Sequence, residues 1–131
     1  MKVRILSVRD HAGEVEVAFT CIAGSGKAVL QSATRPGLVG AETTVELDIA
    51  TCLELGRNCG YDEGSETLIR VDDDLVRFRM VVESQDDDGL AYCRLSNDCV
   101  IMVEVSDRRR LDLGKKVNIG VPVRDVRLTL V

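Results

Sequence analysis

The sequence predicts an all-β protein built from small β-barrels. Two similar half-units, residues 1–65 and 66–131, form one compact domain, with one short helix at about residues 50–57 between them. Apolar and polar residues alternate along most of the chain, and turn-forming residues interrupt the alternation about every 8–12 positions, as in β-sandwiches and barrels. Only one short stretch has a helical pattern, and blocks of the first half recur in the second.

The predicted strands follow one another along the whole chain. Each has apolar side chains on one face or both, and short runs rich in Gly, Asp, Asn or Ser separate most of them. They cover residues 2–8, 14–22, 27–33, 43–49, 67–71, 75–83, 90–95, 99–105, 116–123 and 126–131. Because tryptophan is absent and aromatic residues are 3% of the chain, the core must consist of Val, Leu, Ile and Met.

The predicted helix runs from about Ala50 to Arg57. Its spacing places Cys52 and Leu53 toward the core, and Gly56 and Gly60 then end it.

Two pairs of blocks indicate an internal repeat. "LVGAETTVELDI" (38–49) matches "DLGKKVNIGVPV" (112–123) without a gap, and "DHAGEVEVAF" (10–19) matches "DDDGLAYCRL" (86–95). The alternative is that any two β-meanders resemble each other, because alternation alone produces matches. A duplication and a chance likeness both remain open at this point.

Composition argues against several kinds of partner. The net charge is −5, and neither half carries the basic field of a nucleic-acid-binding protein. The N-terminus lacks the apolar run of a secretory signal, and no segment approaches the ~20 apolar residues of a membrane span. The five cysteines have no framework-like spacing. We therefore expect reduced thiols, a cytoplasmic location, and neither nucleic acid nor membrane as a partner.

Three short motifs suggest ligands but are explained better as turns. "DDDG" (86–89) lacks the alternating oxygen ligands and the distant glutamate of a calcium loop, whereas Asp-Gly between alternating runs favours a hairpin. "VDDDL" (71–75) reads as a polar loop between strands. "AGSGKA" (23–28) lacks the spacing of a phosphate loop and precedes a strand, so a glycine-rich hairpin turn is expected.

No catalytic residue, metal site or cofactor is predicted. The cysteine spacings are wider than the close pairs of structural zinc sites. Cys59, beside Gly60, is expected to be the most reactive thiol. The single histidine, His11, is expected in an exposed turn, and nothing points to a nucleophile and base assembled around it.

Basic residues give the candidate ligand site. The loop "DRRR" (107–110) and two nearby lysines form a basic group. The candidate anion-binding residues are Arg108, Arg109, Arg110, Lys115 and Lys116. Arg77 and Arg79 share the outward face of one strand and are candidate interface residues; the alternative is that both form ordinary cross-strand ion pairs.

The strand "CVIMVEV" (99–105) is apolar on both faces. Cys99, Ile101, Val103 and Val105 are expected in the core, which leaves Val100 and Met102 outward. A half-buried strand should be polar on its second face, so either the other half-unit or a second chain must cover these two residues. We expect a homo-oligomer, with Val100 and Met102 at the interface.

The segment "LDLGKKVNIGVPVRDVRLTL" (111–130) resembles the C-terminal stretch of TOBE domains, the transport-associated OB-like modules that include the molybdate-binding Mop domains. The resemblance covers mainly residues 75–131 and implies an OB-like or TOBE-like barrel. The two segments that surround the oxyanion in Mop domains have no counterpart here, so their ligand residues cannot be transferred.

The expected function is therefore a non-enzymatic binding or interaction protein that assembles as a homo-oligomer. One alternative is a small-oxyanion or other small-molecule binding protein, as the resemblance implies. A small enzyme with a carboxylate site is a further alternative.

Overall fold

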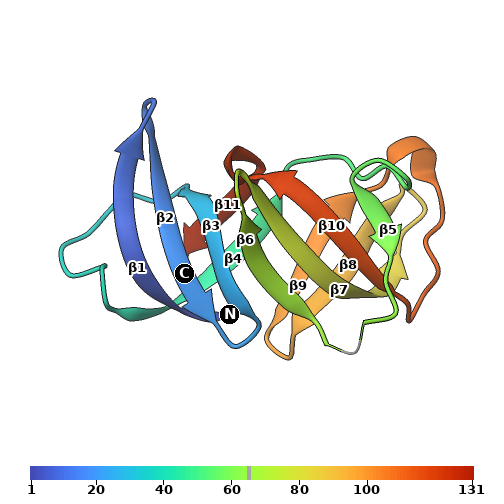
Figure 1. Ribbon diagram of the computed structural model, residues 1–131, viewed down its shortest axis with the longest axis horizontal. Coiled ribbons are helices and arrows are strands. Elements are labelled where there is room, and N and C mark those ends of the chain that lie inside the picture. The colour runs from blue at the N-terminus through green and yellow to red at the C-terminus, as the bar shows by residue number, and fades with distance from the viewer. Residues whose placement is uncertain (65) are drawn as a thin grey trace.

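The computed structural model describes residues 1–64 and 66–131 and shows an all-β protein (Figure 1). Its strands are β1 (Lys2–His11), β2 (Glu14–Cys21), β3 (Gly24–Leu30), β4 (Glu42–Ile49), β5 (Cys59–Tyr61), β6 (Leu68–Asp72), β7 (Leu75–Gln85), β8 (Leu90–Ser96), β9 (Cys99–Glu104), β10 (Lys116–Pro122) and β11 (Val126–Leu130). Two single turns of 3₁₀-helix, η1 (Ser106–Arg108) and η2 (Val123–Asp125), complete the described elements. None of the helical segments of the described chain is long and apolar enough to cross a membrane.

Five strands close a β-barrel, which we call the first barrel. Its order is β1–β2–β3–β11–β4, and β4 pairs with β1 again to complete the circle. All these pairings are antiparallel except that of β11 with β3. Alternate side chains fill the interior, as the period of two predicts.

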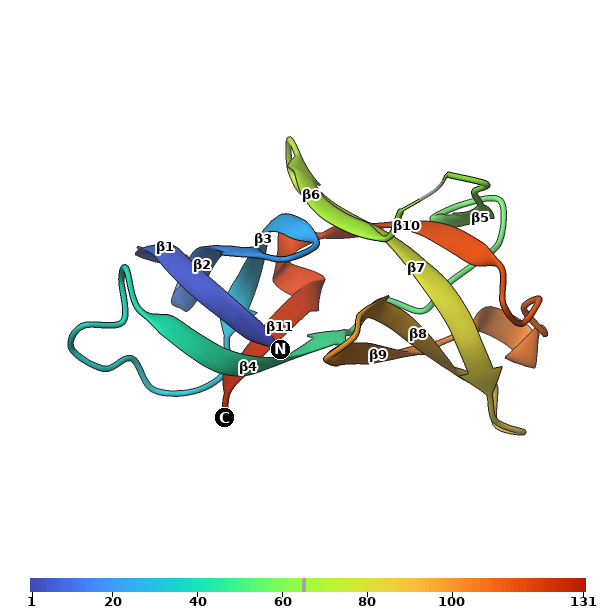
Figure 2. The ribbon, with the colours of Figure 1, turned by 90° about the horizontal axis from the view of Figure 1, so that it is seen from below.

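The remaining strands form a second β-unit beside the first barrel (Figures 1 and 2). The long strand β7 pairs with β10 along one edge and with β6 and then β8 along the other, while β9 follows β8 and β5 follows β10. Bridges at Leu53 with Val105 and at Leu55 with Cys59 connect the β9 side to β5. One bridge between Gly24 and Ile69 joins β3 to β6 and makes the sheet continuous.

Each sequence half supplies a segment to the other half's unit. After β4 leaves the first barrel, the chain from Leu53 to Tyr61 enters the second unit between β9 and β10. After β10 leaves the second unit, β11 returns to the first barrel between β3 and β4. The halves at 1–65 and 66–131 are therefore interlocked in space.

The two halves share the same local geometry. In the first, the amide of Gly40 donates to the carbonyl of Ile5 at 2.7 Å; in the second, the amide of Gly114 donates to the carbonyl of Val82 at 2.7 Å. Both glycines have positive φ, 84° and 79°. A β-bulge follows Ile5 in β1, and another follows Val82 in β7. The matched "LG" blocks therefore form the same turn.

The register of the second strand in each half differs from the sequence alignment. Phe19 pairs with Ile5, and Cys93 pairs with Val82, so Phe19 and Cys93 occupy equivalent positions. The sequence alignment instead matched Phe19 with Leu95. The β1–β2 hairpin is longer than the β7–β8 hairpin, and a slip of two residues keeps every side chain on its face.

The prediction of a helix at about residues 50–57 is wrong. The segment is extended, because the amide of Leu53 donates to the carbonyl of Glu104 at 2.8 Å and the carbonyl of Leu53 accepts from Ser106 at 2.7 Å. A turn at 56–58 follows. Leu53 is buried as expected, but Cys52 is exposed. Pairing with β9 offers this segment more backbone hydrogen bonds than one isolated helical turn would.

The segment "AGSGKA" is a strand more than a turn. The β2–β3 connection lies at Ile22 and Ala23, and both glycines belong to β3. A Cβ on Gly24 would lie 2.1 Å from the carbonyl oxygen of Ile69, and one on Gly26 would lie 2.6 Å from the Phe19 ring. The glycines therefore allow close packing between the two units, and the expected hairpin turn is wrong in position.

Candidate functional site

A hollow of the surface lies between the two units, and most of its charged groups have no ion-pair partner among the described residues. It has a volume of about 450 Å³. The β1–β2 hairpin and β3 form one side, and the β6–β7 turn together with η2 forms the other. We call it the charged cleft.

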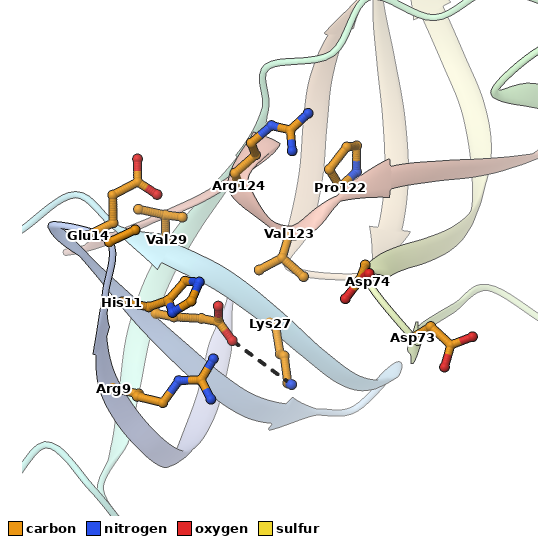
Figure 3. A pocket seen from close by; sticks show the side chains of 12 residues that line it. Arg9, His11, Glu14, Lys27, Val29, Asp73, Asp74, Pro122, Val123 and Arg124 are labelled. Atoms are coloured by element: carbon orange, nitrogen blue, oxygen red, sulfur yellow. Dashed lines mark ion pairs between the residues drawn. The ribbon is translucent and has the colours of Figure 1, made fainter.

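One wall of the charged cleft carries three basic residues together with Glu14 and Glu16. Figure 3 shows Arg9, His11 and Lys27 close together on β1 and β3. Lys27 forms a long ion pair with Glu16, 3.9 Å from Nζ to Oε1. Among the described residues, Arg9 and His11 have no side-chain hydrogen bond or ion pair, and neither does Arg124 of η2.

The opposite wall is the β6–β7 turn, with the carboxylates of Asp73 and Asp74 (Figure 3). The amide of Val123 donates to the backbone carbonyl of Asp74 at 3.3 Å, which attaches the turn to η2. Asp73 adopts a left-handed conformation, with φ of 55°, which aspartate tolerates better than most residues. The polar loop predicted at 71–75 is thus confirmed, and the carboxylate of Asp74 faces the cleft.

A second groove lies on the other side of the junction, where β4 lies against β9. Its volume is about 540 Å³. Val100 is 40% exposed, Met102 47% and Val131 74%, and Tyr92 lies beside them half-buried. We call it the apolar groove. The prediction that Val100 and Met102 point outward is confirmed, and β4 of the first half covers them only in part.

The two hollows involve equivalent strands of the two halves. Leu30 of β3 pairs in parallel with β11, and Val105 after β9 bridges in parallel to Leu53, so Leu30 and Val105 are equivalent. Lys27 lies three residues before Leu30, and Met102 lies three residues before Val105. Lys27 and Met102 are therefore equivalent as well. The same fold position carries a charge in one hollow and an apolar side chain in the other.

The predicted basic residues do not converge on either hollow. The Arg110 guanidinium donates to the carbonyls of Gln85 and Asp86, at 3.2 and 2.9 Å, and lies 3.3 Å from an Asp87 oxygen. It therefore supports the β7–β8 turn. Arg108, Arg109 and Lys115 are exposed, and Lys116 is half-buried.

Arg77 and Arg79 form ion pairs with neighbouring segments. The Nε of Arg77 lies 2.9 Å from an Asp72 oxygen, and that of Arg79 lies 2.8 Å from an Asp62 oxygen. Hydrogen bonding to these guanidinium groups contributes to the lowered pKa of both carboxyls; for Asp62 the amide of Gly64 is the largest cause. The cross-strand alternative is therefore the one observed for Arg77, whose partner lies on β6.

The "DDDG" segment is a hairpin turn, as predicted. The carboxylate of Asp86 accepts from the amides of Asp88 and Leu90, at 3.0 and 2.9 Å, and Gly89 has a φ of 88°. Over residues 1–64 and 66–131, no three His, Cys, Asp or Glu side chains are placed to hold a metal ion.

Cys59 is not the most reactive thiol, contrary to the prediction from the sequence. Cys59 lies in β5 and is buried, and burial raises the pKa of its thiol to about 11. Its thiol therefore stays protonated at neutral pH and is a poor nucleophile. Burial likewise raises the pKa of Cys93 to about 12 and that of Cys99 to about 11. Cys52 is the exposed thiol.

Comparison with protein-family models, with curated proteins and with solved structures gave no match to this chain. The resemblance to TOBE domains therefore stays a prediction. The sequence pointed to His11 only as an exposed turn residue and did not single out Arg9, Asp74 or Arg124. Their spacing along the chain carries no signal, because four separate segments build the charged cleft.

Proposed function

We propose that this chain is a non-enzymatic binding protein that self-associates through the apolar groove. The observation that supports the proposal is the exposure of Val100 and Met102 on a strand whose inner face is fully used by the core. Exposed apolar patches of this kind mark interaction surfaces. The proposal includes a cytoplasmic location, with which five free thiols agree.

The backbone of β9 supports a second copy as the occupant. β9 pairs with β8 along one edge, and on its other edge the carbonyl of Glu104 accepts from Leu53. Backbone groups alternate between the two edges of a strand. The amides and carbonyls of Val100 and Met102 therefore point to the edge that carries Glu104, where no strand pairs with them in the described part of the chain.

An antiparallel β9–β9 pair between two copies would use these groups and bury the apolar side chains together. Such a contact is isologous, as in most homodimers. In the register that places Val100 opposite Met102, Asp98 of one copy lies opposite Glu104 of the other. Like charges oppose each other there, so association should strengthen as salt screens them.

Light scattering at two protein concentrations and two salt concentrations tests the proposal. We expect a mass above 14.3 kDa that rises with concentration and with salt. Met102→Lys should return the chain to a monomer. Ile22→Lys is the matched control, because Ile22 is 89% exposed on the β2–β3 turn, away from the apolar groove. A wild-type mass that stays at 14.3 kDa under all conditions would overturn the proposal.

A second candidate is small-anion binding by the basic loop, as the TOBE resemblance implies. The supporting observation is that Arg108 and Arg109 are exposed and form no ion pair with the described residues. Molybdate, tungstate, sulfate and phosphate should then raise the melting temperature, and Arg109→Gln should reduce the rise. No rise with any of the four anions argues against this candidate.

A further inference from the structure

We propose that the charged cleft binds a small zwitterion of the amino-acid type. Its carboxylate would lie against Arg9 and His11, and its ammonium group against Asp74. This inference goes beyond self-association and does not rest on it, since the charged cleft and the apolar groove have no residue in common.

Arg9 and His11 form no ion pair with the described residues, which supports the proposal that they bind the carboxylate of the ligand. Several arginines of this chain form ion pairs with a neighbouring carboxylate, as Arg77 does with Asp72. Arg9 does not, although the acidic residues Glu14 and Glu16 line the same cleft. A guanidinium group presents several donors in one plane and suits a carboxylate ligand.

The β6–β7 turn provides the carboxylate that would bind the ammonium group of the ligand. Asp73 and Asp74 are exposed, and neither carboxylate forms an ion pair within the described residues. The hydrogen bond from Val123 fixes the backbone of the turn against η2. Figure 3 shows the Asp74 carboxylate across the cleft from Arg9 and Lys27, whereas the Asp73 carboxylate points away from them. Asp74 on one wall therefore lies opposite Arg9 and Lys27 on the other, and no ion pair connects the two walls within the described residues.

The floor of the cleft supports a ligand that also has an apolar part. Val29 is buried, and Pro122 and Val123 are half-buried at its base. The volume of about 450 Å³ lies within the usual range of small-molecule pockets, about 300–1,000 Å³. Apolar lining residues beside Arg9 and Asp74 suit an amino acid whose side chain is apolar.

The charge balance favours a dipolar ligand over a simple anion. Four carboxylates, Glu14, Glu16, Asp73 and Asp74, line the cleft beside three permanently basic side chains. An inorganic anion would be repelled by the carboxylates, whereas a zwitterion has a partner for each sign. The fold itself does not need charge at this position, because Met102 replaces Lys27 in the apolar groove.

Titration calorimetry and thermal shift with glycine, L-alanine, L-leucine, L-glutamate and L-lysine test the inference. We expect at least one of them, L-leucine first, to bind and raise the melting temperature. Its N-acetyl derivative, which lacks the ammonium group, and its amide, which lacks the carboxylate, should each bind at least about 10-fold more weakly, since each loses a charged hydrogen-bonding partner.

Two variants assign the binding to this cleft. Arg9→Gln and Asp74→Asn each remove the charge but keep a polar side chain, and should each weaken binding about 10-fold or more. Arg127→Gln is the control, because Arg127 is exposed on β11 and does not line the cleft. The inference is overturned if none of the five amino acids binds, if the N-acetyl and amide forms bind equally well, or if neither cleft variant weakens binding.

Discussion

Asp62 shows how one carboxylate attaches a connecting segment to the second unit. It accepts hydrogen bonds from the amide of Gly64 at 2.7 Å and from Nε of Arg79 at 2.8 Å, and a third from the amide group of Asn118. The Gly64 amide, the Arg79 guanidinium and Asn118 hold the pKa of Asp62 below its ordinary value. The carboxylate thus joins the residues after β5 to β7 and β10.

The lowered pKa of Asp62 predicts a pH-dependent contribution to stability. A carboxyl whose pKa is lower in the folded state stabilises the fold above its unfolded pKa of about 3.9, and this contribution is lost as the pH falls through the folded value. Asp62→Asn should therefore lower the urea midpoint at pH 7, and the difference from wild type should shrink below about pH 4.

Asp88→Asn is the control for this measurement, because the Asp88 carboxylate is exposed in a turn and accepts no hydrogen bond from the described residues. Its urea midpoint should follow that of the wild type at both pH values. If the urea midpoints of Asp62→Asn and wild type differed equally at both pH values, the ionised carboxylate of Asp62 would not be the cause of the lower stability.

At the level of elements, the turns at Gly40 and Gly114 are the clearest structural evidence that the halves correspond. The amide of Gly40 donates to β1 and that of Gly114 to β7, and each residue has a positive φ. A Cβ on either glycine would meet no atom within 4 Å. Alanine would therefore be strained by backbone conformation alone, in the same way at both positions.

We predict that Gly40→Ala and Gly114→Ala destabilise the protein by similar amounts, about 1–2 kcal/mol each. The double variant should lose the sum to within about 0.5 kcal/mol, because the turns share no partner. Urea denaturation measures these free energies of unfolding. Gly60→Ala is the control: its site is equally open and its φ is not positive. Clearly unequal losses would contradict the equivalence of the turns.

For the whole molecule, the exchange of segments is the dominant feature. β11 fills the place between β3 and β4, and the Leu53–Tyr61 segment connects β9 to β10. At the crossing, Thr51 Oγ1 donates to an Asp125 oxygen at 2.6 Å. Neither unit is complete without a segment from the other half, so both should fold and unfold together.

Native-state hydrogen exchange tests this cooperativity. The slowest amides of β2, in the first barrel, and of β7, in the second unit, should exchange with the same free energy of opening. Deleting residues 126–131, which removes β11, should lower the protection of both strands. If β7 kept its full protection after the deletion, the two units would be independent in stability.

Local patterns in the sequence were sufficient for most strands and for the "DDDG" turn, because alternation and Asp-Gly turns depend on neighbouring residues. They failed at residues 50–57, where spacing resembling a helix was overridden by pairing with β9. They also failed at Gly24 and Gly26, whose role is to let Ile69 and Phe19 approach β3. Arg110 looked available for an anion, yet it supports a turn 24 residues away in the chain.

By itself, then, the sequence determined the all-β character, the alternate burial of β9 with Val100 and Met102 outward, and the likeness of the two halves. These features follow from the two-residue period of a strand and from turn chemistry, which are local. Only the tertiary structure decided that the halves exchange segments and that Arg9, Lys27, Asp74 and Arg124 border one cleft. Those features depend on which distant segments pair, and the pattern along a single strand carries no information about its partner.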